Sequence, residues 1–182
     1  LRNVVAGGFE GPVWGVNPRR PALSGAACFA SIAELPAVPS VAAVAAPAAV
    51  VPAAVAALGE KGCRVAVVLS QGVVGPIRQA MLDAARPHLL RVVGPDSIGV
   101  MIPALGLNLS VAHLPATRGR VALVSQSGAI ATTLIDWAVE HGIGFSHVAS
   151  LGAMSDVDIG DYLDLLAGDG HTTAVLAYSE SI

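Results

Sequence analysis

The sequence contains few charged residues and very few aromatic ones. Lys, Arg, Asp and Glu make up 13 % of the 182 residues, and Phe, Trp and Tyr make up 4 %. A net charge of −3 without a basic block argues against nucleic acid as a partner, and the scarcity of aromatic rings argues against stacking on single strands. The chain is too apolar for disorder, because 54 % of its residues are hydrophobic.

Other common signals are missing as well. The two cysteines, Cys28 and Cys63, lack the spacing of metal ligands, so free thiols in a reducing cytoplasm are expected. No signal peptide is visible, and the chain begins with Leu1 rather than methionine. The G-x-G-x-x-G fingerprint does not occur, which disfavours an ordinary nucleotide-binding Rossmann protein.

One apolar run imitates a membrane span. Residues 41–58 contain no polar side chain, but most of them are alanine, and Pro47 and Pro52 interrupt the run. The segment therefore predicts a strand, a turn at Pro47 and a helix with Pro52 in its first turn, and no membrane association.

The rest of the chain alternates between strand-like and helix-like segments, which favours an α/β fold with parallel sheets. Residues 94–119 break this rhythm with prolines and glycines, and we interpret them as the crossover between two units. The predicted strands are 12–16, 41–46, 64–69, 90–93, 120–124, 145–149 and 173–178, and the predicted helices are 49–60, 75–86, 128–141 and 158–167.

Polar, glycine or proline residues follow the predicted strands where each one ends. Ligands of open parallel sheets lie beyond the carboxyl ends of the strands, so this edge is the expected site. Taken singly, the arginine pair also fits a solvated surface and residues 70–72 also fit a simple turn. The segments are Asn17–Arg20, Ala46–Pro47, Ser70–Gly72, Gly94–Ser97 and Ser125–Gly128.

The junction at residues 120–138, RVALVSQSGAIATTLIDWA, is the most informative of these segments. A short apolar run ends at Ser125, and a helical pattern begins after Ser127, a plausible N-cap, and Gly128. The first turn of a helix presents unpaired N–H groups and a partial positive charge, which suit a phosphate or carboxylate. A well-capped turn without a ligand is the alternative interpretation.

Residues 155–166, SDVDIGDYLDLL, could be taken for a metal site. They lack the glycine and the terminal glutamate of a calcium loop. An acidic helix start with Asp156 or Asp158 at its N-terminus fits better, and no metal is expected.

Taken in order, several segments resemble the α-type region of NDP-forming acyl-CoA synthetases, the succinyl-CoA and acetyl-CoA ligase superfamily. Within it, the sequence looks most similar to the synthetase-like half of bacterial lysine acetyltransferases that carry a GNAT domain. The segments are GGFEGPVWGVNP (7–18), VAAVAAPAAVVP (41–52), VVLSQG (67–72), VVGPDSIGV (92–100), GRVALVSQSGAIATTLIDWA (119–138), GIGFSHVASLGAMSDVDIGDYLDLL (142–166) and AVLAYSESI (174–182).

This resemblance implies a Rossmann-like CoA-binding domain, residues 1–118, without its first strand and glycine-rich loop. The start of a flavodoxin-like ligase domain, residues 119–182, would follow. It also implies residue roles. Arg19 or Arg20 would hold a CoA phosphate; Pro47, Ser70, Gln71, Asp96 and Ser97 would contact CoA; Ser127 and Gly128 would receive a phosphoryl group; and Glu180 would be the catalytic carboxylate that positions a phosphohistidine.

The implied cofactor is CoA or acyl-CoA, with ATP or ADP supplied by a missing or partner domain. The implied partners are a β-type ATP-grasp subunit or domain, or a GNAT domain, in a cytoplasmic oligomer.

By the family pattern the phosphohistidine would follow Ile182, so this chain alone should not turn over. Asp96 stands where the family has a neutral amide, and its charge would repel a polyanionic cofactor. A non-catalytic regulatory or scaffolding module of an acetyltransferase is therefore the alternative function.

Overall fold

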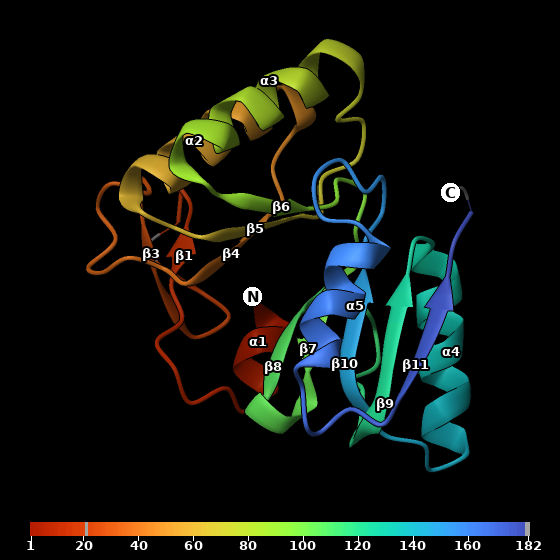
Figure 1. Cartoon of the computed structure of the whole chain (residues 1–182). Coiled ribbons are helices and arrows are strands. Elements are labelled where there is room, and N and C mark those ends of the chain that lie inside the picture. Colours follow the sequence, from red (N-terminus) through yellow and green to blue (C-terminus); the bar gives the residue numbers. More distant parts are fainter. Residues whose placement is uncertain (21, 181–182) are drawn as a thin grey trace.

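The computed structural model describes residues 1–20 and 22–180 and shows an α/β fold, as the sequence predicted (Figure 1). The helices are α1 (Arg2–Ala6), α2 (Val51–Lys61), α3 (Gly75–Ala85), α4 (Gly128–Glu140) and α5 (Ile159–Ala167), with short 3₁₀ turns η1 (Ala48–Val50), η2 (Arg86–His88) and η3 (Pro103–Leu105). The strands are β1 (Gly15–Val16), β2 (Ala22–Leu23), β3 (Ala26–Phe29), β4 (Val41–Val44), β5 (Val65–Val68), β6 (Arg91–Val93), β7 (Gly99–Ile102), β8 (Leu107–Ser110), β9 (Arg118–Ser125), β10 (Phe145–Ser150) and β11 (Ala174–Tyr178).

In the described part of the chain these strands form three sheets. A small sheet has the order β1-β3-β2, a parallel sheet has the order β4-β5-β6, and a larger sheet has the order β11-β9-β10-β7-β8. The strands β9, β10 and β11 run parallel, so their carboxyl ends lie at the same edge (Figure 1).

The apolar run at residues 41–58 folds as predicted. It forms β4, a turn at Pro47 and the helix α2, which carries Pro52 in its first turn. The helix ends at Gly62, whose φ of +96° places it in the left-handed region that glycine adopts without strain. None of the helices among the described residues is long and apolar enough to cross a membrane.

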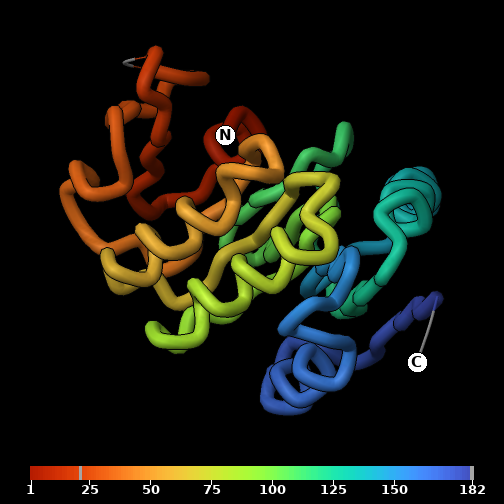
Figure 2. The backbone as a smooth tube through the Cα atoms, turned by 90° about the horizontal axis from the view of Figure 1, so that it is seen from above, coloured from red at the N-terminus to blue at the C-terminus, as the bar shows by residue number. Residues whose placement is uncertain are grey.

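Alternate residues of the sheet β4-β5-β6 face opposite layers. Ala66 and Val68 pack against α2 and α3 through Val55 and Met81, and α2 and α3 lie side by side over this face (Figure 2). Val67 points to the other face, toward the second unit. Both faces of this short sheet are therefore covered, which explains its almost continuous apolar strands.

The larger sheet lies between α4 and α5 (Figure 1). Leu123 of β9 packs with Ile135 of α4, whereas the neighbouring Val124 packs with Leu166 of α5. The cluster on the α5 side also contains Val67 and Val93 from the first sheet, so the two sheets share one hydrophobic core.

The segment between the two units differs from the prediction. Residues 94–119 are more than a crossover, because β7 and β8 form a hairpin there, and β7 pairs antiparallel with β10. The apolar runs at residues 99–102 and 107–110 are short, and Pro103 and Gly106 separate them, so neither gave a clear strand pattern. The hairpin belongs to the second sheet although it precedes residue 118.

Candidate functional site

A cavity of about 410 Å³ opens where the two units meet. It brings together five residues that the sequence predicted as site residues, from four separate segments of the chain. The lining residues are Gln71, Asp96, Ile98, Gln126, Ser127, Gly128, Ala129, Gly152, Ala153 and Glu180.

The N-terminus of α4 forms one wall of this cavity. Ser127 is the N-cap, with extended backbone angles, and its hydroxyl accepts a hydrogen bond from the Ile130 N–H at 3.4 Å. The first turn of this 13-residue helix contains no acidic side chain. Ser127 and Gly128 are half-buried and Ala129 is exposed, so the start of the helix is open to the cavity. Such an end attracts anions, because several of its N–H groups have no partner within the helix.

Gly128 is the first residue of α4, and it also lies very close to the side chain of Ile98. A Cβ atom at this position would lie 2.6 Å from Ile98 Cγ2, so any side chain there would push against the segment that leads into β7. The absence of a side chain lets the α4 N-terminus and the residues after β6 share the same cavity.

Asp96 contributes a carboxylate from the loop between β6 and β7. The residue is exposed, its φ is +60°, and its N–H donates to the Ser70 oxygen at 3.1 Å. On the other side of the loop, the Ala153 N–H donates to the Pro95 oxygen at 2.8 Å. The loop is thus bonded to both units, and this fixes the position of Asp96 at the cavity.

Ser97 has a different environment from Asp96. Its side chain is only 4 % exposed, its hydroxyl donates to the Ser150 oxygen at 2.5 Å, and the same hydroxyl accepts from the Gly99 N–H at 2.8 Å. The structure therefore places Ser97 in a buried joint between the two sheets, outside the cavity lining.

Glu180 completes the wall at the end of β11. It is exposed, and its N–H donates to the Gln126 side-chain oxygen at 2.8 Å. The described lining thus combines two acidic residues, Asp96 and Glu180, with the positive end of α4 and includes no basic residue.

Among the predicted CoA residues, Gln71 and Asp96 line this cavity and the others do not. Ser70 is buried, and its hydroxyl donates to the Ala46 oxygen at 2.6 Å and accepts from the Ala46 N–H at 3.1 Å, which joins the ends of β4 and β5. Pro47 is exposed and begins η1. Arg19 and Arg20 are exposed in the turn after β1, where the Asn17 side chain accepts from the Arg19 N–H at 2.9 Å.

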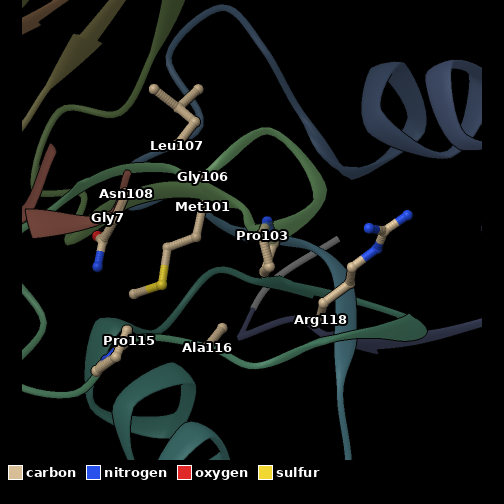
Figure 3. A pocket seen from close by; sticks show the side chains of 9 residues that line it. All are labelled: Gly7, Met101, Pro103, Gly106, Leu107, Asn108, Pro115, Ala116 and Arg118. Atoms are coloured by element: carbon tan, nitrogen blue, oxygen red, sulfur yellow. The ribbon is translucent and has the colours of Figure 1, made fainter. Parts of the chain in front are cut away.

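A second, smaller cavity of about 120 Å³ lies near the start of β9 (Figure 3). Arg118 is the charged side chain of its lining, and its guanidinium points away from the other labelled side chains (Figure 3). No residue predicted for the site lines this cavity. Its lining residues are Gly7, Met101, Pro103, Gly106, Leu107, Asn108, Pro115, Ala116 and Arg118.

The acidic segment before α5 has a structural role. Asp158 is the N-cap and forms a capping box with Asp161, which agrees with the predicted acidic helix start. Arg91 binds Asp156 at 3.0 Å and Asp161 at 2.9 Å, and the hydrogen bond and charge of Asp156 raise the pKa of Arg91 above its ordinary value. In the described parts of the chain, no group of three or more His, Cys, Asp or Glu side chains could hold a metal ion.

The sequence placed Gln126 in the segment Ser125–Gly128 at the expected edge but assigned it no role, and it did not single out Ile98 or the loop Gly152–Ala153. Gln126 directly follows β9 and Gly152 closely follows β10, so the carboxyl-end rule applied to those strands gives the signal for both. Ile98 has no such signal, because only the packing of β7 beside β10 brings it to the cavity.

Comparison with known proteins agrees with this two-unit arrangement. A family model described as a CoA binding domain matches residues 1–103, and one described as a succinyl-CoA ligase like flavodoxin domain matches residues 118–182. Acetate–CoA ligase (ADP-forming) I of Archaeoglobus fulgidus is 32 % identical over 180 residues, which cover 96 % of this chain and 26 % of that protein. Acetate–CoA ligase (ADP-forming) I subunit alpha of Pyrococcus furiosus is 30 % identical over 192 residues, which cover 100 % of this chain and 42 % of that subunit.

Among solved structures, the apo form of the dinucleotide forming acetyl-coenzyme A synthetase 1 of Ca. Korarchaeum cryptofilum superposes with a TM-score of 0.95 and 30 % identity. The match covers 100 % of this chain and 40 % of that one. The chain therefore spans well under half the length of these relatives.

The fold, the cavity and the two matches define the class: an α/β protein in which a CoA-binding unit precedes a ligase-like flavodoxin unit. The chain belongs to the CoA-binding domain family, and its relatives place it in the NDP-forming acyl-CoA synthetase superfamily. At this level the resemblance stated from the sequence motifs is confirmed.

Proposed function

We propose that this chain is the CoA- and acyl-CoA-recognising portion of an NDP-forming acyl-CoA synthetase-like protein. The complete reaction would convert an acid, CoA and NTP into acyl-CoA, NDP and phosphate. One observation carries the proposal: in a chain whose first 103 residues match a CoA-binding domain, the predicted anion-receiving end of α4 opens into a cavity at the junction of both units.

The α4 N-terminus would receive the phosphoryl group. Its first-turn N–H groups are fixed before any ligand arrives, so they can stabilise developing negative charge by a few kcal/mol without reorganisation. Ser127 and Gly128 would border that group. Glu180 would orient a phosphohistidine supplied by another segment or by a partner.

The remaining predicted residues would hold CoA in the first unit. Arg19 or Arg20 would bind a CoA phosphate through its guanidinium. Pro47 and Gln71 would border the CoA groove, and the hydrogen bonds of Ser70 to Ala46 would fix its shape. We propose residues 1–118 and 119–182 as the two functional domains. The second family match, which begins at residue 118, supports this division.

Asp96 and Ser97 would act at the boundary between the two domains. The Asp96 carboxylate lines the cavity and would weaken the binding of a polyanion, whereas Ser97 would keep the Asp96 loop in place. This acidic wall is the observation that favours the second candidate function, a regulatory or scaffolding module with weak CoA affinity.

The partners belong to the same proposal. A β-type ATP-grasp subunit or domain would bring ATP or ADP, in a cytoplasmic oligomer, and the name "subunit alpha" of a relative supports a partner subunit. The finer resemblance to the synthetase-like half of GNAT-fused lysine acetyltransferases rests on the sequence motifs, and a GNAT domain would then be the partner.

Isothermal titration with CoA and with acetyl-CoA tests the proposed function. We expect saturable heat for both ligands, at least tenfold weaker binding by the variant Arg19→Ala/Arg20→Ala, and unchanged binding by the control Arg78→Ala on the exposed surface of α3. A folded protein that gives no heat at millimolar CoA would reject the CoA function.

A further inference from the structure

Gln126 links the two loops that form the mouth of the cavity. Strands β9 and β11 run parallel, with Ser125 paired to Tyr178, so the residues after each strand emerge side by side. The Gln126 N–H donates to the Tyr178 oxygen at 2.9 Å and continues this pairing for one more residue.

The side chain of Gln126 then holds the loop after β11. Its Oε1 accepts the Glu180 N–H at 2.8 Å and the Ser179 hydroxyl at 3.4 Å. One side-chain oxygen thus anchors both residues that immediately follow β11, including the residue that carries the cavity carboxylate.

This anchor matters because of what faces Glu180. Glu180 lines the same cavity as the N-terminus of α4, whose first turn has no acidic residue of its own. A mobile carboxylate beside such an end is attracted to its N–H groups and would occupy the place of a ligand anion. A fixed loop backbone limits how far the Glu180 side chain can move toward α4.

We infer that Gln126 is a positioning residue: its side-chain oxygen holds the Ser179–Glu180 turn so that the Glu180 carboxylate stays at the cavity wall and leaves the N-terminus of α4 open. The inference deepens the proposed function and rests on it for the identity of the incoming anion.

The test is a double-mutant cycle on the 182-residue chain, followed by NMR without any ligand. Gln126→Leu removes the acceptor, Glu180→Gln removes the charge, and the double variant removes both. Gln126→Glu keeps an acceptor oxygen at the same place. Gln126→Met is a second variant without the acceptor, for use if the Gln126→Leu protein does not fold. The matched control is Gln79→Leu, which removes a side-chain bond to Asp83 at 2.9 Å on the surface of α3.

We expect the Glu180 amide to exchange about tenfold faster in Gln126→Leu, and at the wild-type rate in Gln126→Glu and Gln79→Leu. In the Gln126→Leu background, Glu180→Gln should shift the amide resonances of Gly128 and Ala129, because the carboxylate then reaches α4. In the wild-type background the same substitution should leave these resonances in place. Unchanged exchange in Gln126→Leu, or equal shifts in both backgrounds, would overturn the inference.

Titration with inorganic phosphate separates this inference from the proposed function. Phosphate affinity should fall at least threefold in Gln126→Leu and recover in the double variant, and a merely structural role of Gln126 would not give this recovery. If the wild-type chain shows no phosphate-dependent shifts, the phosphoryl site of the proposed function fails. Even in that case, the double-mutant cycle measured without any ligand tests the positioning role of Gln126.

Discussion

The helices α4 and α5 start at equivalent places in the larger sheet, but their N-termini differ in charge. Each follows a parallel strand at the carboxyl edge of the larger sheet, α4 after β9 and α5 after β10. The N-cap of α4 is the neutral Ser127, and its first turn lacks an acid. The N-cap of α5 is Asp158, whose carboxylate accepts the Asp161 N–H, and the Asp161 carboxylate accepts the Asp158 N–H in return.

The difference shows that the same strand-to-helix connection can give a helix N-terminus that only stabilises the fold and another that can bind an anion. The start of α5 carries its own negative charge, balanced by Arg91, and needs no ligand. The start of α4 has only a hydroxyl that accepts at 3.4 Å, so part of its positive potential remains for an external anion. The first two predictions below each change one of these helix starts, and the last two change charged residues elsewhere.

The largest effect is expected at the entry to α5. Asp156→Ala removes the carboxylate that accepts a hydrogen bond from the N–H of the fully buried Val92 at 2.7 Å. The same substitution also removes one of the ion-pair partners of Arg91. We expect a loss of about 2 kcal/mol in the free energy of unfolding, measured with urea. The exposed Asp164→Ala serves as the control, and a loss no larger than that of the control would contradict the structural role of this end.

A swap of capping chemistry tests the α4 end. Ser127→Asp gives α4 the charged N-cap that α5 already has, so inorganic phosphate should bind at least tenfold more weakly. The free energy of unfolding should stay the same or rise by about 0.5 kcal/mol. Phosphate-induced amide shifts measure the affinity, and Thr133→Asp on the exposed side of α4 is the control. Unaltered phosphate binding in Ser127→Asp would show that the open end of α4 is not the site.

A smaller change is expected from Asp96, which lines the same cavity as the start of α4. Asp96→Asn keeps the size of the side chain and removes its charge, so phosphate and CoA should bind about threefold more tightly, given solvent screening. The gain should shrink as salt is added, which a change in shape would not explain. Asp83→Asn, on the exposed surface of α3, should leave the affinity for phosphate and CoA as it is.

The smallest effect concerns the far end of α5. The Thr172 hydroxyl donates to Asp169 at 2.6 Å and the His171 N–H donates to it at 3.1 Å, and these bonds lower the pKa of Asp169 from 3.8 to about 2. Because the folded-state pKa is lowered, this stabilisation is present above pH 3.8 and is lost as the pH falls toward 2. Asp169→Asn should flatten that part of the acid unfolding curve, followed by circular dichroism, whereas Asp164→Asn should not.

The sequence predicted the parts of the fold that have long, regular patterns. The strand and helix at residues 120–138 were found because the strand contains a continuous apolar run and the apolar residues of the 13-residue helix recur at helical spacing. The hairpin β7–β8 and the short strands β2 and β3 were missed, because turn residues interrupt their apolar runs: Pro103 and Gly106 in the hairpin, and Ser24 and Gly25 between β2 and β3.

The site was predictable wherever the carboxyl-end rule applies. This rule placed Gln71, Asp96 and Ser127 at one edge, and the structure brings them to one cavity. It gave no information about which way a side chain faces, so it grouped the buried Ser70 and Ser97 with the exposed Asp96. It also did not reveal that Arg19 and Arg20 belong to a turn beside a separate small sheet.

The hydrophobic core that both sheets share decides how this protein can be handled in the laboratory. A fragment that begins near residue 99 would bare Val100, Val124 and Leu151 to water, and a fragment that stops before it would bare Val67 and Val93. Neither piece would be a well-behaved sample when expressed alone, so crystallisation, labelling or domain-exchange work needs to keep both pieces in one polypeptide.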